Sequence, residues 1–189
     1  MIRVTDLCKS FGETQVLRSL SFTVETGEKV FLSAPSGAGK TTLLRILCGL
    51  EAPDGGTVEG CDPNEIAFQF QEPRLFPSLT ALQNVTCIAP DPASAEAAAR
   101  DLLSRLGLSD ALDKRPDELS GGMKQRVALA RTLFADRPVV LLDEPFAALD
   151  PELKDSVRRL VAETCAEKTV ILVSHDPADA CLTQRTLTL

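Results

Sequence analysis

The first third of the chain has the hydrophobic pattern of short strands. Runs rich in β-branched residues and Phe predict strands at residues 2–6, 21–25 and 29–33, separated by glycine-containing turns at residues 11–12 and 26–27. Residues 40–48 predict a helix that stops at Gly49, and the segment 51–56 predicts a loop. Apolar residues then alternate with small or polar ones, which indicates a strand from Ile66 to Gln71.

The middle of the chain, residues 78–134, has almost no strand signal. Asp91-Pro92 is a good helix start, because Asp accepts hydrogen bonds from free N–H groups and Pro suits the first turn. One apolar face at helical spacing, closed by Gly107, consists of Ala95, Ala99, Leu102, Leu103 and Leu106. A second consists of Met123, Val127, Ala130 and Phe134. We therefore expect a helical insert.

The last third returns to alternating strands and helices. The all-apolar runs 139–142 and 169–173 are typical of strands buried on both faces of a parallel sheet. Apolar residues at helical spacing between positions 153 and 164 predict a helix with a charged outer face, and the last five residues predict a short strand. The expected fold is α/β, with a mainly parallel sheet, a small N-terminal antiparallel β part and an inserted α-helical subdomain.

Composition limits the classes of function. A length of 189 residues, with 44% hydrophobic and 25% charged residues, fits one soluble globular domain. The net charge of −7 disfavours binding of bulk nucleic acid, a single His excludes a His-rich metal site, and no apolar run approaches the ~20 residues of a membrane-spanning helix. The six cysteines lack C-x-x-C spacing, and we expect them to be reduced and mostly small core residues.

Residues 34–41, APSGAGKT, form a phosphate-binding pattern between a predicted strand and a predicted helix. Its glycines let backbone N–H groups point at phosphate oxygens, Lys40 can reach the β- and γ-phosphates, and the Thr41 hydroxyl can bind Mg²⁺. Ala34 stands where the first glycine is usual, and we expect little loss from its methyl group. The alternative is a glycine-rich turn with a surface lysine, but the strand and helix on either side favour the phosphate loop.

Two further segments have weaker signals of their own. VVLLDEP places Asp143 and Glu144 at the end of a buried strand, where a Mg²⁺-organising acid and a base for an attacking water are expected. The alternative is an acidic cap for the next helix. LSGGMKQR at 119–126 offers the Ser120 hydroxyl and unhindered N–H groups at a helix start, which suits an anion or an ordinary serine N-cap.

The chain resembles the nucleotide-binding subunit of an ABC transporter. The resemblance rests on segments in the family's order: APSGAGKT, Gln71 after a strand, LSGGMKQR, VVLLDEP, AALD at 147–150 and SHD at 174–176. It implies a P-loop NTPase fold in one domain, 1–189. Within that domain, 1–77 and 135–189 would form a RecA-like core with its N-terminal β part, and about 78–134 the helical subdomain with the signature motif.

The resemblance also implies roles for individual residues. ATP would be bound by Phe11, Ala34, Pro35, Ser36, Gly37, Ala38, Gly39, Lys40, Thr41, Thr42 and Asp143. Catalysis would use Glu144, His175, Gln71 and Lys40, with Mg²⁺ held by Thr41, Gln71 and Asp143. The ATP held by a second copy of the chain would be bound in trans by Ser120, Gly121, Gly122 and Asp150. For Phe11, the alternative to stacking on adenine is a hydrophobic plug beside a turn.

The sequences of these motifs are most similar to those of importer ATPases of the nitrate, sulfonate and taurine class. The implied function is ATP hydrolysis that powers transport of a small solute, with permease subunits, a second copy of the chain and, indirectly, a solute-binding protein as partners and with no nucleic acid. The chain would lie in the cytoplasm on the inner face of the membrane. The apolar segment Leu75-Phe76-Pro77 would meet the permease, or pack on its own helical insert.

Three other functions stay open at this stage. One is an ABC ATPase that drives a membrane process other than import, such as lipid, lipoprotein or export work. Another is a soluble ABC ATPase unconnected with transport, although a second ATPase domain or a long coiled coil does not fit in this length. A P-loop kinase or GTPase would leave LSGG and His175 unexplained. Only 14 residues follow His175, so we expect a short family member without a C-terminal regulatory domain.

Overall fold

The computed structural model describes all residues, 1–189, and divides them into two compact units. The first, here the core unit, consists of residues 1–68, 137–143 and 167–189. The second, here the helical unit, consists of residues 69–136 and 144–166. The chain therefore passes between the units several times, and neither unit is a single continuous segment. The assignment of about 78–134 to a helical subdomain stays a prediction.

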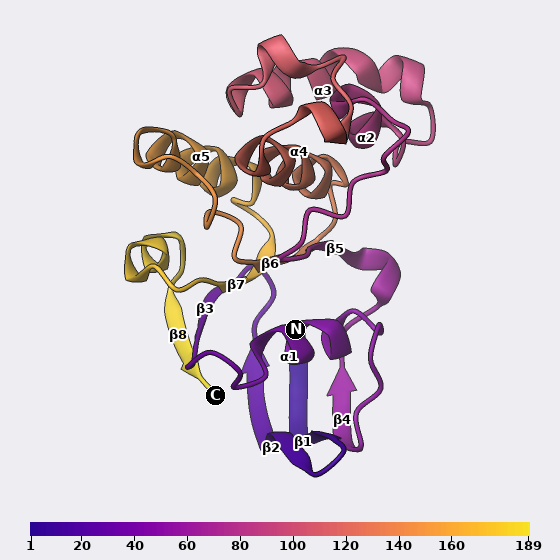
Figure 1. Ribbon diagram of the computed structural model, residues 1–189. Helices are drawn as coiled ribbons and strands as arrows, with labels where there is room; N and C mark the ends of the chain where they lie inside the picture. Colours follow the sequence, from indigo (N-terminus) through magenta and orange to yellow (C-terminus); the bar gives the residue numbers. More distant parts are fainter. The chain divides into compact units, whose positions relative to one another are not determined.

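The core unit begins with an antiparallel sheet of three strands in the order β2-β1-β4 (Figure 1). β1 (Ile2–Phe11) and β2 (Thr14–Val24) form a long hairpin, paired from Ile2 opposite Val24 to Phe11 opposite Thr14. β4 (Gly55–Glu59) pairs with the other edge of β1. The hairpin turn therefore places Phe11 at the end of this sheet.

The second sheet has the strand order β5-β6-β7-β3-β8. Its strands are β3 (Lys29–Ser33), β5 (Ile66–Gln69), β6 (Val139–Asp143), β7 (Thr169–Val173) and β8 (Arg185–Thr188). β3 pairs in parallel with β7 and β8, and β6 pairs in parallel with β7. All five residues of β7 are buried, as expected of a strand covered on both faces. The carboxyl ends of β3, β6 and β7 consequently meet at one edge.

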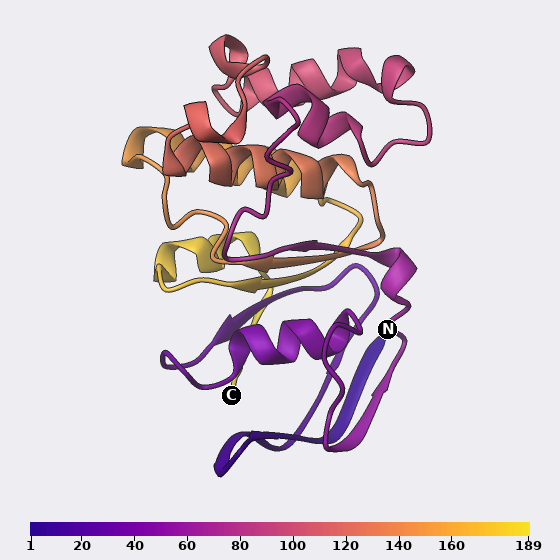
Figure 2. The same ribbon diagram turned by 45° about the vertical axis from the view of Figure 1, so that its right-hand side comes forward.

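Helix α1 (Lys40–Leu47) lies between the two sheets of the core unit (Figure 2). Its apolar side chains belong to one buried cluster that also contains residues of both sheets. The members from α1 are Leu43, Leu44, Ile46 and Leu47. The start of α1, where the phosphate loop ends, is therefore fixed by packing on two sides.

The helical unit contains α2 (Ala81–Thr86), α3 (Pro92–Arg105), α4 (Gly121–Phe134) and α5 (Pro151–Thr164). Helices α2, α3 and α4 pack against one another (Figure 1). Side-chain caps from Thr80, Asp91 and Ser120 begin them, because each oxygen accepts a hydrogen bond from a free N–H group. Arg105 of α3 forms an ion pair with Glu163 of α5.

Short 3₁₀ turns connect the longer elements. They are η1 (Pro63–Glu65), η2 (Ser109–Ala111), η3 (Pro116–Glu118) and η4 (Pro177–Leu182). None of the helices has both the length and the apolar character that a membrane span needs.

Most elements agree with the sequence pattern, but five expectations differ from the structure. The strand expected at 2–6 continues to Phe11 as β1, the strand expected at 21–25 is the end of a longer strand, β2, and the strand from Ile66 stops at Gln69. The expected loop at 51–56 runs into β4 at Gly55, where pairing with β1 extends the backbone. The cysteines are all free, but only Cys165 is buried, and two of the others are exposed.

Candidate functional site

Glycine shapes the loop between β3 and α1. Gly37 and Gly39 have φ angles of 80° and 93°, in the left-handed region that other residues rarely adopt. A Cβ atom at Gly39 would lie 2.7 Å from Val16 Cγ1 and 2.8 Å from Leu17 Cδ2 of β2. Backbone conformation and packing therefore both require glycine there. Gly39 is the N-cap of α1, whose free N–H groups and dipole attract anions.

Lys40 holds the loop closed. Its Nζ atom donates hydrogen bonds to the carbonyl oxygens of Ala34, at 2.6 Å, and Pro35, at 3.0 Å. Lys40 is only 7% exposed, so a cation is held in a largely buried position by the loop's own backbone. Ala34 is not among the residues with a positive φ angle, so alanine replaces the usual glycine there without backbone strain.

Thr41 and Asp143 bring two side-chain oxygen atoms together beside the loop. The Thr41 hydroxyl donates a hydrogen bond of 2.6 Å to Asp143 Oδ2, and Asp143 is 1% exposed at the end of β6. Burial raises the pKa of Asp143, while the Thr41 hydrogen bond and the charges of Lys40 and His175 oppose that rise. Hydroxyl and carboxylate oxygens are ligands that Mg²⁺ prefers.

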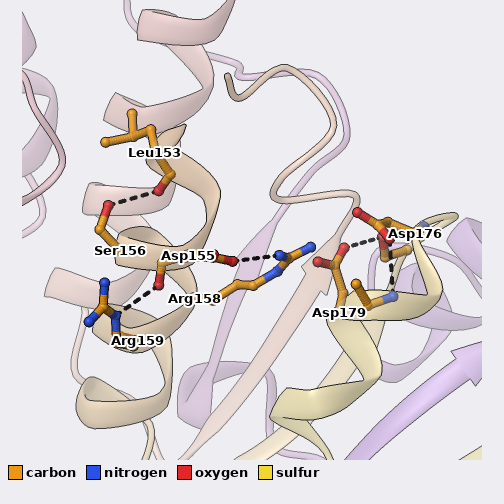
Figure 3. Close-up of polar contacts among 9 residues, drawn as sticks. Leu153, Asp155, Ser156, Arg158, Arg159, Asp176 and Asp179 are labelled. Carbon is orange, nitrogen blue, oxygen red and sulfur yellow. Dashed lines mark hydrogen bonds and ion pairs between the residues drawn. The ribbon is translucent and has the colours of Figure 1, made fainter. Parts of the chain in front are cut away.

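His175 lies in the turn after β7. Its side chain is exposed, whereas the preceding residue, Ser174, is 9% exposed. The Ser174 hydroxyl donates to Asp179 and accepts a hydrogen bond from the backbone N–H of Asp176. Figure 3 shows Asp176 and Asp179 together on this turn. The backbone on either side of His175 is thus tied to one hydroxyl group.

Phe11 ends β1 with its side chain 49% exposed. The Nζ atom of Lys9 lies 5.2 Å from the centre of the Phe11 ring and bonds to Glu51 Oε1 at 2.8 Å. An exposed ring at a sheet end is available for stacking and is not a buried hydrophobic plug.

A cavity of about 320 Å³ lies in the same core unit. It is lined by residues of β2, among them Thr14, Val16 and Arg18, and by Gly37 and Ala38 of the phosphate loop. Its size is at the lower end of the range for small-molecule sites.

The helical unit carries the LSGG segment at the start of α4. Ser120 is the N-cap, and its hydroxyl accepts a hydrogen bond of 3.3 Å from the Met123 N–H. Ser120 and Gly121 are exposed, and a Cβ atom at Gly121 would meet nothing within 4 Å. A Cβ atom at Gly122 would lie 2.5 Å from the carbonyl oxygen of Ala148. The segment is therefore open to solvent on one side and packed against the AALD turn on the other.

Asp150 is the last residue of the AALD turn in the helical unit. It is exposed, and it is the N-cap of α5 without a side-chain capping bond. Its charge partly offsets the effect of burial, which lowers the pKa of Arg126. Arg126 donates hydrogen bonds to the carbonyl oxygens of Leu106, at 2.8 Å, and Gly107, at 3.1 Å. The arginine thus joins the end of α3 to the helix that begins at Ser120.

The segment after Gln71 is attached to α4 through its backbone. Gln125 Nε2 donates to the Gln71 carbonyl oxygen at 2.8 Å, and Arg131 donates to the carbonyl oxygens of Pro73 and Arg74. The Gln71 side chain is exposed. Gln125 and Arg131 both lie on α4, so the position of this segment depends on that helix.

The apolar residues that follow combine an anchored backbone with an exposed ring. The buried side chain of Asn84 accepts from Phe76 N at 2.8 Å and donates to Phe76 O at 3.2 Å. The Phe76 side chain itself is 52% exposed, and Arg131 lies 5.8 Å from its ring centre. The loop therefore rests on the helical insert while presenting one aromatic ring to solvent.

Glu144 has a strained backbone. It directly follows Asp143, is 6% exposed and has a φ angle of 53°. A left-handed conformation costs a non-glycine residue on the order of 1 kcal/mol, and such strain is common at functional sites. The geometry fits neither a relaxed helix cap nor a surface acid.

The expected site residues fall into two groups. The core unit contains Phe11, the loop residues Ala34, Pro35, Ser36, Gly37, Ala38 and Gly39, the helix residues Lys40, Thr41 and Thr42, and Asp143 and His175. The helical unit contains Gln71, Ser120, Gly121, Gly122, Glu144 and Asp150. Within the core unit, Thr41 acts on Asp143 through a hydrogen bond, and Lys40 and His175 act on it through their charges. The roles of all these residues remain predictions.

Comparison with known proteins identifies the family. Residues 17–147 match the family described as ABC transporter. The match runs from β2 through the phosphate loop, α4 and the acidic pair. The chain belongs to the ABC transporter family.

Two curated relatives of this ABC protein are both named as import ATP-binding proteins. It is 41% identical to an Fe(3+) ions import ATP-binding protein of Rhodococcus jostii, FbpC 3, over 95% of the chain and 56% of the relative. It is 43% identical to the aliphatic sulfonates import ATP-binding protein SsuB 1 of Nocardia farcinica, over 95% of the chain and 73% of the relative. The chain thus spans little more than half the length of the iron-import relative.

A solved structure gives the same fold. The ATP-binding cassette MJ0796, in a dimeric post-hydrolysis state bound to ADP and Pi, superposes with a TM-score of 0.91 at 30% identity. The superposition covers 100% of this chain and 94% of that one. The expected P-loop α/β fold and the resemblance to ABC ATPases are therefore confirmed.

Several residues that support the expected site residues were given no role from the sequence. They are Ser174 and Asp179 around His175, and Gln125, Arg126 and Arg131 on α4. The last three follow the LSGG segment on one helix, so helical spacing gave a signal for them. Asp179 gave none, because an acid soon after Pro177 also suits the exposed first turn of a helix.

Proposed function

We propose that this chain binds and hydrolyses ATP and thereby powers an ABC transporter, most plainly an importer of a small solute. The observation that carries the proposal is the Thr41–Asp143 hydrogen bond of 2.6 Å beside a glycine-shaped loop that holds Lys40. A cation, helix N–H groups and two oxygen ligands are what a nucleotide triphosphate with its metal ion requires.

The triphosphate would occupy the loop 34–41. Lys40 would exchange the carbonyl oxygens of Ala34 and Pro35 for phosphate oxygens, and the N–H groups at the start of α1 would point at the same charge. The nucleoside would lie toward Phe11, with the cavity beside β2 near the loop. Stacking on an exposed ring suits any flat base, and we propose adenine because of the family.

The residues present fit a bound Mg²⁺ ion. Thr41 and Asp143 supply oxygen atoms that already lie 2.6 Å apart, and Gln71 would supply a third. When bound, the ion would neutralise phosphate charge. Asp143 suits this role because burial disfavours its charged form, and a bound cation would stabilise the carboxylate.

Hydrolysis requires residues that act on the attacking water and on the γ-phosphate. We propose Glu144 as the base, His175 as a hydrogen-bond donor to the γ-phosphate and Gln71 as a group that orients the water. Ser120, Gly121, Gly122 and Asp150 would complete the site on a second copy of the chain. ATP would then close a dimer, and its hydrolysis would remove the group that joins the two copies.

For the transported solute, we propose a chemical class and no single compound. The relatives' names include iron, sulfonate and sulfate import, so a small inorganic or sulfur-containing anion or a metal ion is the range supported. We propose that the chain works on the inner face of the membrane, bound to permease subunits that meet the exposed Phe76. A solute-binding protein would act on the other side.

The activity is tested with Glu144→Gln. We expect turnover of ATP to fall at least a hundredfold while ATP affinity stays within about twofold, because the amide keeps the shape but cannot accept the proton. Glu152→Gln, at an exposed position in the first turn of α5, is the matched control. Phosphate release by Glu144→Gln at the wild-type rate would contradict the assignment of the base.

The membrane partner needs a separate experiment. Purification of the tagged chain from detergent-solubilised membranes should recover integral membrane subunits with it. Replacement of Phe76 by Ser should weaken that recovery without changing ATP affinity, because the ring is exposed while the backbone is held by Asn84. Recovery of only peripheral proteins would contradict a role in transport.

A further inference from the structure

We propose that Asp179 is a positioning residue for His175 and that it acts through the hydroxyl of Ser174. The inference rests on the proposed function, because the role of His175 is part of that proposal. It gives a role to Ser174, which the SHD segment contains without a role of its own, and to Asp179, which lies outside every motif; both residues lie in the core unit.

The Ser174 hydroxyl is the junction of this arrangement. It lies directly after β7, donates a hydrogen bond of 2.5 Å to Asp179 Oδ2 and accepts one of 3.1 Å from Asp176 N. A hydroxyl that donates to a carboxylate forms a short, strong bond, and its orientation is then fixed for the second bond. The N–H group that follows His175 is therefore aimed by the side chain that precedes it.

Asp179 is held firmly enough to direct that hydroxyl. It is 0% exposed within η4, and its own N–H donates to the Asp176 carbonyl oxygen at 3.0 Å. The Asp176 carboxylate accepts from Ala178 N at 3.0 Å, which caps the same turn (Figure 3). The six residues from Ser174 to Asp179 are thus joined by side-chain and backbone hydrogen bonds.

A buried carboxylate at this place calls for a reason. Burying a charge costs several kcal/mol unless it is well bonded, and an apolar residue in η4 would carry no such cost. The carboxylate does, however, fix the backbone on both sides of one exposed histidine. A fixed backbone would keep the His175 ring within reach of a phosphate. This position matters because small displacements of a catalytic group reduce the rate by large factors.

The test compares variants that differ only in the bridging hydroxyl. Ser174→Thr keeps the hydroxyl and adds a methyl group, and Ser174→Val has the shape of that threonine with a second methyl group in place of the hydroxyl. Asp179→Asn removes the charge at the other end of the bond. Thr183→Val is the matched control, because the Thr183 hydroxyl donates to Ala180 O at 2.8 Å at the end of the same turn without reaching Ser174. Each is also made together with His175→Ala, and kcat and the Kd for MgATP are measured.

We expect Ser174→Val and Asp179→Asn to lower kcat roughly tenfold, with the Kd for MgATP within about twofold of the wild type. Ser174→Thr and Thr183→Val should keep at least half of kcat. In the His175→Ala background, neither Ser174→Val nor Asp179→Asn should lower kcat further, because residues that act through His175 have nothing left to position.

Other results overturn the inference in distinct ways. Equal kcat values for Ser174→Val and Ser174→Thr, or an undiminished loss in the His175→Ala background, would show a merely structural role for the hydroxyl. A wild-type rate in His175→Ala alone would contradict the proposed function of His175 itself. A large loss in His175→Ala with none in Asp179→Asn would contradict only the role of Asp179.

Discussion

The phosphate loop and the LSGG segment are both proposed anion sites at the start of a helix, but they differ in how complete they are. The loop holds a cation that is 7% exposed and an oxygen pair that is already hydrogen-bonded. The LSGG segment has an exposed serine whose hydroxyl is used by its own helix, and an exposed Gly121. We therefore expect the loop to hold a phosphate group by itself and the LSGG segment only to add donors to a phosphate that is already held.

This difference explains why two copies of the chain would be needed. N–H groups at a helix start contribute partial charges, which are weak in water and stronger when water is excluded. A second surface that carries phosphate would supply both the charge and the exclusion of water. The first region should therefore govern affinity and the second should govern turnover.

The largest effect is expected at the loop. Lys40→Ala removes the cation and its two bonds to loop carbonyl groups, so ATP affinity should fall by two to three orders of magnitude. Fluorescent-nucleotide titration measures this, with Lys114→Ala at an exposed position as the control. Unchanged affinity in Lys40→Ala would remove the loop from the site.

Ser120→Arg should separate turnover from affinity. The bulky side chain blocks an approaching copy, so hydrolysis should fall about a hundredfold, whereas each chain should bind ATP as before. Ser109→Arg, an exposed serine of η2 in the same unit, is the control. Hydrolysis at the wild-type rate in Ser120→Arg would show that the LSGG segment takes no part.

Gly121 and Gly122 of the LSGG segment differ in what surrounds them, so their alanine variants can be compared directly. Gly122→Ala places a Cβ atom 2.5 Å from Ala148 O, and the required backbone shift should cost about 1–3 kcal/mol of unfolding free energy. Gly121→Ala meets nothing within 4 Å and should leave stability nearly unchanged. Denaturant unfolding compares the two, and equal stability losses would contradict the packing of Gly122 on the AALD turn.

The smallest expected effect concerns pH. The pKa of Asp143 is raised in the folded chain by burial, so stability from this group is lost as the pH rises through the folded value. Asp143→Asn should therefore raise the melting temperature by about 2 °C near pH 7, and the gain should shrink as the pH falls toward 3.8, the ordinary value. Asp117→Asn, at an exposed position, is the control, and a lower melting temperature in Asp143→Asn would contradict the cost of burial.

Local signals predicted those elements whose cause is local. The Asp91-Pro92 start of α3 and the apolar runs of β6 and β7 could be found because capping and burial act through neighbouring residues. β4 could not, since Gly55–Glu59 has few apolar residues and becomes a strand by pairing with β1, about fifty residues earlier. α2 has only six residues and depends on its Thr80–Gln83 capping box.

The same distinction holds for the site. The loop, the acidic pair and His175 belong to short patterns, so their positions could be predicted. The hydrogen bond from Ser174 to Asp179 and the attachment of Gln71 to Gln125 depend on how turns and helices pack. The sequence shows neither the burial of Asp179 nor the left-handed backbone of Glu144, because both arise from the folded surroundings.

The central claim, that ATP joins two copies of the chain through one complete and one incomplete site, is tested most directly by sedimentation of Glu144→Gln. We expect a monomer without nucleotide and a dimer with ATP, because the bound nucleotide is not hydrolysed. Addition of Ser120→Arg to that variant should leave ATP binding intact and abolish the dimer. Saturation of Glu144→Gln with ATP without any change in mass would contradict the account.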